Sequence, residues 1–239
     1  MSNRLEYYVN NYEKLKIGVD EPFKFNCTMC GKCCINREDI LLNAKDIYNL
    51  TIALEMTAKE VIDKYCDCYI GDNSRLPLVR LKAVGLTKRC PLLKGNRCSV
   101  HSNKPIVCAM FPIGRAIKQE LSDGEQAHID YLFSDPHCGD RRKTHTVREW
   151  FDSFGIPLED KFFLKWQEVM KTLIRKVSAM EKKLPKSAMS IVWSAVHICL
   201  YEHYDQTKEF LSQFEENTKK LYELLDAIEL NAGGESDET

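Results

Sequence analysis

The sequence predicts an α+β fold that is predominantly helical, because its two halves follow different patterns. Ten of its 11 cysteines lie between Cys27 and Cys138, in a part whose regular elements look short. Beyond that part, apolar residues recur at helical spacing. We therefore expect a small, cysteine-rich, metal-organised module with short hairpins over residues 1–145. An antiparallel helical bundle is expected over residues 146–239, packed on that module.

The first half contains the start signals of two short helices. Residues 43–54 place apolar side chains on one helical face, and Asn43 is a suitable N-cap. Thr57 and Glu60 have the spacing of a capping box, which predicts a second helix that runs to about Tyr65.

Strand signals in the first half are short and separated by turn residues. Apolar and basic residues alternate over 76–84, which predicts a strand. Residues 90–98 look like a hairpin between two cysteines. Residues 113–120 and 127–133 predict another hairpin, turning around 122–124.

The second half reads as a series of helices. A capping box at Thr146 and Glu149 opens the first of them. A long amphipathic helix is predicted from Leu158 to Leu184, followed by helices over 188–204 and 210–228. The connections between these helices are short, as in antiparallel neighbours.

Charge and apolar content limit the partners that we expect. Lys and Arg number 34 and Asp and Glu number 35, for a net charge of -1, which disfavours a dedicated nucleic-acid binder. The basic stretch 141–148 is accordingly expected to be a solvated loop that leads into a helix.

No secretory h-region opens the chain, and no apolar run has the length of a membrane span, so we expect a cytoplasmic protein without a membrane partner. Cytoplasmic cysteine clusters more often bind metal or do redox chemistry than form disulfides.

Four thiols occur within eight residues in the run Cys27-Thr-Met-Cys30-Gly-Lys-Cys33-Cys34. Two-residue spacers let consecutive thiolates converge on one centre, and Gly31 allows a tight turn. Four further cysteines follow downstream, which makes eight candidate ligands for two four-coordinate sites or for one site and a cluster. The predicted metal ligands are Cys27, Cys30, Cys33, Cys34, Cys90, Cys98, Cys108 and Cys138.

These residues carry a resemblance to a known family. The cysteine run, the stretch Cys90-Pro-Leu-Leu and the stretch Pro105-Ile-Val-Cys108-Ala-Met-Phe-Pro112 resemble the YkgJ-like cysteine-cluster family with its C-x2-C-x2-C-C signature. The resemblance covers roughly residues 25–140 and implies a zinc- or iron-chelating domain that uses the eight cysteines. Lys104 and Ala109 stand where the family commonly has arginine. Flagellin lysine N-methylases carry a similar cysteine region.

Thiolate ligands suit both zinc and iron, so the sequence does not decide which of these metals binds. The candidate cofactors also include an iron–sulfur cluster. Our leading hypothesis is a metal-binding protein whose further activity is unassigned. A second hypothesis is an iron-centre enzyme for redox chemistry or protein side-chain modification, such as lysine N-methylation. A third is an adaptor with structural zinc whose C-terminal helices bind a protein partner.

Other residues near the cluster have alternative roles. Cys66 and Cys68 are expected to be partly buried thiols, with auxiliary ligation as the alternative. His101 and His137 are weighed as metal or thiolate partners against satisfied structural histidines, and the structural role is preferred. Cys199 lies on an apolar helix and is expected in the core.

Overall fold

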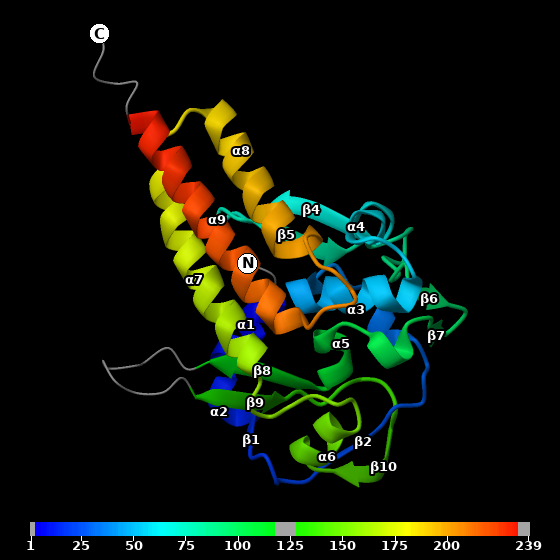
Figure 1. Cartoon of the computed structure of the whole chain (residues 1–239). Coiled ribbons are helices and arrows are strands. Elements are labelled where there is room, and N and C mark those ends of the chain that lie inside the picture. Colours follow the sequence, from blue (N-terminus) through cyan, green and yellow to red (C-terminus); the bar gives the residue numbers. More distant parts are fainter. Residues whose placement is uncertain (1–2, 118–127, 234–239) are drawn as a thin grey trace. The chain divides into compact units, whose positions relative to one another are not determined.

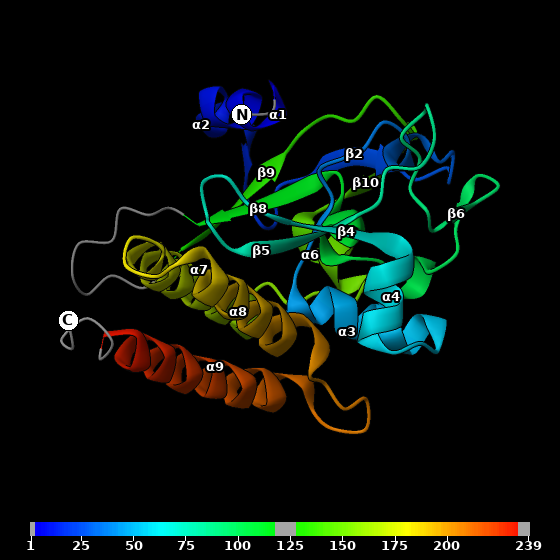
Figure 2. The ribbon, with the colours of Figure 1, turned by 90° about the horizontal axis from the view of Figure 1, so that it is seen from above.

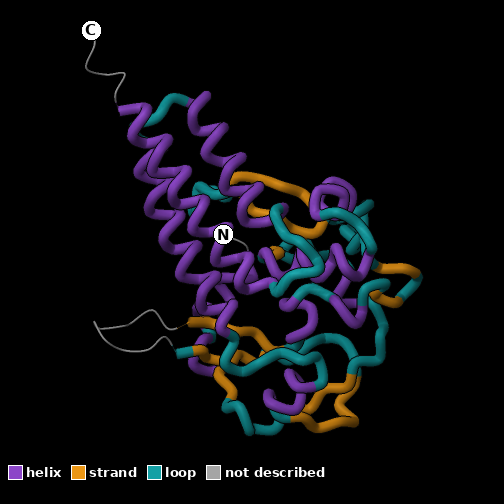
Figure 3. Tube along the Cα trace, in the orientation of Figure 1, coloured by secondary structure: helices purple, strands orange, loops and turns teal. Residues whose placement is uncertain are grey.

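A computed structural model describes residues 3–117 and 128–233 of the chain (Figure 1). Helices account for 49% of it and strands for 19%, so helix dominates. The strands form small sheets, and the last helices form a bundle, as the secondary-structure colouring of Figure 3 shows. The predicted α+β, mostly helical class is therefore confirmed.

Helices and strands are mixed along the first part of the chain, and the described residues 147–233 form helices and their connections without a strand. The described helices are α1 (Asn3–Asn10), α2 (Tyr12–Leu15), α3 (Ala44–Leu54), α4 (Ala58–Tyr65), α5 (Ile106–Met110), α6 (Val147–Asp152), α7 (Lys161–Glu181), α8 (Lys186–His197) and α9 (Phe210–Gly233), with 3-10 turns η1 (Lys32–Cys34) and η2 (His101–Asn103) and a π-helix η3 (Ile198–Glu202). The described strands are β1 (Lys16–Ile17), β2 (Phe23–Asn26), β3 (Leu41–Leu42), β4 (Cys66–Ile70), β5 (Pro77–Leu81), β6 (Leu93–Lys94), β7 (Arg97–Cys98), β8 (Ile113–Ile117), β9 (Ile129–Phe133) and β10 (Asp140–His145). Among the described residues, none of the helices combines the length and apolar character that a membrane crossing requires.

The chain folds into two compact units, each built from segments that are separate in sequence. Unit 1 comprises Met1–Cys34, Lys94–Cys98 and Ile106–Asp160, and unit 2 comprises Ile35–Leu93, Ser99–Pro105 and Lys161–Thr239. The division groups residues by their contacts in space, so each unit contains segments from different parts of the sequence. The expected domains 1–145 and 146–239 stay a prediction.

Unit 1 contains a three-stranded antiparallel sheet of order β1-β9-β8 and a two-stranded ribbon of β2 and β10. The pairing of Ile113 with Phe133 and of Ile117 with Ile129 confirms the predicted hairpin, and its expected turn at 122–124 lies outside the described residues. Aromatic residues of the ribbon and of α6 form the core, where Phe25 packs edge-on against Trp150. The Thr146 capping box opens α6 as predicted.

Unit 2 contains a three-stranded sheet of order β3-β5-β4 and the helices α3, α4, α7, α8 and α9. Capping boxes at Asn43 and Thr57 open α3 and α4, as predicted from their side chains. The bundle helices α7, α8 and α9 lie side by side (Figures 1 and 2), and the apolar stripe of α7 is buried at Val169, Leu173, Val177 and Met180.

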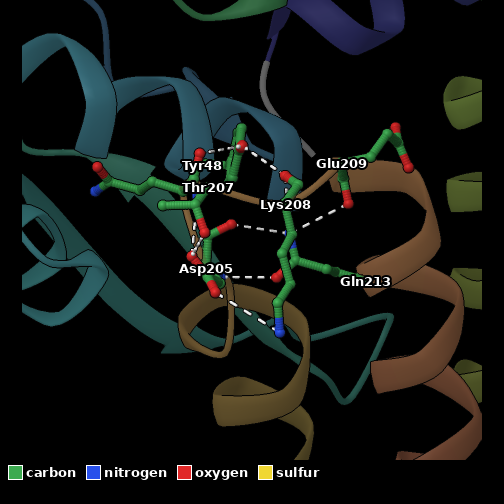
Figure 4. A network of polar contacts seen from close by, with 7 residues as sticks. Tyr48, Asp205, Thr207, Lys208, Glu209 and Gln213 are labelled. Carbon is green, nitrogen blue, oxygen red and sulfur yellow. Dashed lines mark hydrogen bonds and ion pairs between the residues drawn. The ribbon is translucent and has the colours of Figure 1, made fainter.

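A polar network fixes the connection between η3 and α9 within unit 2 (Figure 4). The Tyr48 hydroxyl on α3 donates to the Lys208 carbonyl at 3.1 Å. Gln213 on α9 accepts from the Asp205 backbone N–H at 2.7 Å and donates to the Asp205, Lys208 and Glu209 carbonyls. These bonds satisfy backbone groups of the loop before α9, and the Glu209 carboxylate accepts from the Leu211 and Ser212 N–H groups at the start of that helix.

The structure corrects several sequence predictions of local structure. Residues 140–145 form β10 instead of a loop, because they pair with β2. The second predicted helix does end at Tyr65 as expected, and Cys66 and Cys68 follow it on β4, beside β5. The helix predicted over 188–204 is divided between α8 and the π-helix η3.

Candidate metal centre

The β2–β10 ribbon brings the two ends of the cysteine-rich region together. Asn26, the last residue of β2, pairs with Asp140, the first residue of β10, and its side chain donates to the Asp140 carboxylate at 3.1 Å. Cys27 directly follows this pair, and Cys138 precedes it by two residues. Antiparallel pairing thus places residues separated by more than a hundred positions at one end of the ribbon.

A close backbone approach at Gly139 makes this end of the ribbon compact. Gly139 has φ +68°, in the left-handed region that favours glycine. A Cβ atom there would lie 2.5 Å from the Asn26 carbonyl oxygen and 2.8 Å from the Phe25 ring. The absence of a side chain at residue 139 therefore lets the Gly139 backbone lie against Asn26, the residue that precedes the cysteine run.

The cysteine run itself is a tightly turned loop. Met29 and Gly31 both have positive φ values, of +51° and +73°, as residues in tight turns often do. The Cys34 N–H donates to the Gly31 carbonyl at 2.9 Å and closes that turn. The Cys33 and Cys34 sulfur atoms lie 3.8 Å apart. The loop therefore gathers its thiols at short range.

Backbone donors stabilise the thiolate of Cys30. Hydrogen bonds from the backbone N–H of Lys32, and then of Gly139, lower the pKa of Cys30 against the opposing effect of burial. The Gly139 contact joins the loop to the segment that carries Cys138. Cys30 is consequently disposed to act as an anionic ligand.

Cys138 has the opposite shift. Burial raises the pKa of Cys138 to about 11, together with the negative charges of three nearby thiolates. In decreasing order of effect, these are Cys33, Cys30 and Cys27. Mutual repulsion of this kind shows that the four thiols are neighbours, and a bound cation would relieve it.

The four thiols lie near one another without surrounding a common point. Within residues 3–117 and 128–233, no three His, Cys, Asp or Glu side chains are set at metal-ligand geometry. All eleven cysteines lie in these ranges and are thiols, with no disulfide among them. Thiols that are reduced and gathered fit a zinc or iron ion by their donor chemistry, and sites of this kind commonly close when the metal binds.

Residues 26–138 match the model of a protein family whose description reads "CxxCxxCC: Putative zinc- or iron-chelating domain". This segment is similar to that domain, and the match covers slightly less than half of the chain. The match confirms the family resemblance seen in the cysteine pattern and supports metal binding in general. No solved structure matches the chain.

Only some of the predicted ligands of the CxxCxxCC domain fall into the gathered group. That group comprises Cys27, Cys30, Cys33 and Cys138, with Cys34 beside Cys33. Cys98, at the end of β7, and Cys108, on α5, also belong to unit 1 but to other elements. Cys90 belongs to unit 2, where its charge contributes to the raised pKa of Cys66.

The other thiols and histidines that sequence singled out have varied surroundings. Cys66 is buried, which raises its pKa to about 12, whereas Cys68 on the same strand is exposed. His101 opens η2 in unit 2, and burial lowers its pKa. His137 is exposed beside Cys138, and Cys199 is half-buried on η3.

Sequence reasoning missed the part played by backbone groups at this site. The N–H donors of Lys32 and Gly139 and the close approach at Gly139 become visible only when β2 and β10 are paired. The single signal in the sequence is the glycine that directly follows Cys138.

Proposed function

We propose that this protein binds a zinc or iron ion through the thiolates of Cys27, Cys30, Cys33 and Cys138. The observation that carries the proposal is the end of the β2–β10 ribbon, where the Asn26–Asp140 pair and the close approach at Gly139 bring Cys138 beside the run that begins at Cys27. Four sulfur ligands are the number that a tetrahedral zinc or iron site requires. A dipositive ion among them would offset the repulsion between these thiolates.

The chemistry of the surroundings supports a thiolate centre. Backbone N–H groups already favour the thiolate form of Cys30, and such donors commonly accompany metal-bound sulfur. Without a metal, neighbouring thiols are prone to oxidation, so a reducing compartment such as the cytoplasm is the setting that we propose. Cys34, Cys98 and Cys108 of unit 1, and Cys90 of unit 2, stay predicted ligands of a metal.

Metal content of anaerobically purified protein tests the proposal. We would measure zinc, iron and acid-labile sulfide per chain in the wild type and in Cys30→Ser and Cys138→Ser. The matched control is Cys199→Ser, which removes a half-buried thiol on η3 of unit 2. We expect both cluster variants to lose one metal centre and the control to keep the wild-type content.

The outcomes also separate the chemical classes. Colourless protein with zinc indicates a closed structural site, whereas a brown sample with iron and sulfide indicates an iron–sulfur centre. Full metal content in Cys138→Ser would show that the four-thiolate assignment is wrong.

A further inference from the structure

Strand β4 forms an edge of the sheet β3-β5-β4 in unit 2 (Figure 1). Its residues, Cys66–Ile70, pair with β5 in one unbroken antiparallel register. Within residues 3–117 and 128–233, β5 is the only strand that pairs with β4. The opposite edge strand, β3, has two residues, and so short an edge offers little for another chain to pair with. The edge of this sheet that another strand could extend is therefore β4.

Hydrogen bonds at the end of β5 show which way its backbone groups point. The Leu81 N–H donates at 3.0 Å to the carbonyl of Ile40, which directly precedes β3. The next N–H, that of Lys82, donates at 2.9 Å to the carbonyl of Tyr65, which directly precedes β4. These directions alternate along an antiparallel strand, so every second residue of β5 bonds to β4.

The same alternation divides the residues of β4. Asp67 and Tyr69 lie opposite the β5 residues that face β4, so their N–H and C=O groups bond to β5. The alternate residues, Cys68 and Ile70, direct their N–H and C=O groups outward, away from β5. Cys66 has the same direction, but its N–H donates into the last turn of α4. In the part of the chain that the structure describes, no group bonds to the outward backbone of Cys68 or Ile70.

The side chains of β4 leave this edge unprotected. Natural sheets protect exposed edges with lysine, with proline or with a bulge, and β4 contains none of these. Cys68 is exposed, and Tyr69, on the other face of the sheet, is 39% exposed. The charged residue of β4, Asp67, lies 3.6 Å from Arg80 on β5, which offsets its charge. An extended segment can therefore approach β4 without meeting an uncompensated charge.

We propose that β4 pairs antiparallel with β4 of a second copy of this chain, about a two-fold axis at Tyr69. The outward backbone groups select this register. With Tyr69 opposite itself, Cys68 of each copy lies opposite Ile70 of the other, and every outward group of both residues finds a partner. An axis at Cys68 would set Ile70 opposite Cys66, whose N–H is already bonded. An axis at Ile70 would set Cys68 opposite the turn that follows the strand.

The side chains of two identical strands also suit one another in this register. Tyr69 meets its counterpart at a non-hydrogen-bonded position, where opposed side chains are closest and aromatic pairs add stability. The Arg80 guanidinium lies 5.1 Å from the centroid of the Tyr69 ring, so the ring is already held in place. On the other face, exposed Cys68 is covered by Ile70 of the second copy. A second copy supplies each contact twice, as a two-fold interface does.

Sedimentation velocity of the full-length protein as purified tests the pairing. It is measured from about 1 to about 500 µM, because an interface of one short strand is small and small interfaces are weak. Tyr69→Lys sets like charges opposite each other at the axis. Ile70→Pro removes an outward N–H and spares the bonds to β5, since edge strands tolerate proline at such a position. The matched control, Tyr7→Lys, makes the same replacement at another exposed tyrosine, on α1.

We expect the wild type and Tyr7→Lys to dimerise as the concentration rises. Tyr69→Lys and Ile70→Pro should each raise the dissociation constant at least about tenfold, with circular dichroism spectra like that of the wild type. A wild type that stays monomeric throughout the range would overturn the proposal. Dimerisation of Tyr69→Lys equal to that of Tyr7→Lys would overturn it as well, since β4 would then lie outside the interface.

Cross-linking with glutathione disulfide, read by mass spectrometry, tests the register. Across the axis the two Cα atoms of residue 69 lie about 4.5 Å apart, which is within the range of a disulfide. Tyr69→Cys should therefore link two copies through residue 69. Asp67→Cys is the matched control on the same face, because its two positions lie about 14 Å apart along the strands. Equal linkage through residues 67 and 69 would overturn the register.

A labelled octapeptide of alternating threonine and valine tests the other kind of occupant. We expect it to compete weakly with the dimer, because it lacks the opposed tyrosine. If the wild type stayed monomeric and bound this peptide, and Ile70→Pro abolished the binding, the edge would belong to a foreign strand. That outcome would overturn pairing with a second copy.

Discussion

The sharpest structural prediction concerns Gly139→Ala, at the point where β10 approaches β2. A left-handed φ of +68° costs a non-glycine residue about 1 kcal/mol. The new Cβ would also lie 2.5 Å from the Asn26 carbonyl oxygen, which is backbone and cannot rotate away. Relieving that contact by a backbone shift adds about 1–3 kcal/mol. We expect a total destabilisation of the ribbon of about 2–4 kcal/mol.

Gly155→Ala is the matched control within unit 1. Gly155 has a similar φ of +63°, but no atom lies within 4 Å of the position that its Cβ would occupy. Its substitution should therefore cost about 1 kcal/mol, from the backbone conformation alone. The difference between the two variants isolates the close approach at Gly139.

Hydrogen exchange, measured by mass spectrometry on peptides that cover β2 and β10, reports the stability of the ribbon in each variant. An extra cost of about 1–3 kcal/mol corresponds to exchange that is about 5- to 150-fold faster in Gly139→Ala than in the control. Metal content of the same samples should fall in Gly139→Ala only, because Cys138 is displaced from the cysteine run. Equal exchange in the two variants, with equal metal content, would refute the reasoning that this contact assembles the site.

Two further predictions concern polar contacts within each unit. Burial alone would raise the pKa of Asp130, but hydrogen bonds from Tyr12 and Lys16 outweigh it and lower that pKa. A lowered folded-state pKa stabilises the fold above about pH 4, and this contribution is lost as the pH falls through the folded-state value. Asp130→Asn should thus cost about 1–3 kcal/mol at pH 7 and less near pH 3, as measured by urea unfolding; a cost that does not change with pH would contradict this. Gln213→Ala should destabilise unit 2 by about 1–3 kcal/mol because several backbone groups lose their partner, whereas exposed Gln167→Ala should have little effect in the same assay.

Local signals predicted the helices well. The capping boxes at Thr57 and Thr146 and the N-cap at Asn43 open helices where expected, because a cap depends on residues three positions apart. The buried stripe of α7 follows from apolar spacing in the same way. Strands that pair across long distances in sequence were missed, and β10 is the clearest example. Its basic, exposed residues have no strand pattern of their own, and β2 supplies the pairing.

The candidate site shows a similar division. The spacing of the run from Cys27 to Cys34 indicated the family whose model matches this segment, because the ligand pattern lies within a few neighbouring residues. Cys138 was recognised as a ligand candidate, but its place beside three members of the run depends on the ribbon. Spacing alone also offered no means of separating Cys90, in unit 2, from the seven candidates in unit 1.

Sequence by itself determined the helix-rich class, the helix starts and a thiol-rich domain of a zinc- or iron-chelating family. These properties depend on residues that are close along the chain, where caps, apolar periodicity and ligand spacing act. Tertiary structure decided which thiols are neighbours and which of them has a lowered pKa. Those properties arise when β2 and β10 pair across the chain, since pairing then sets the backbone contacts and charges around Cys30 and Cys138.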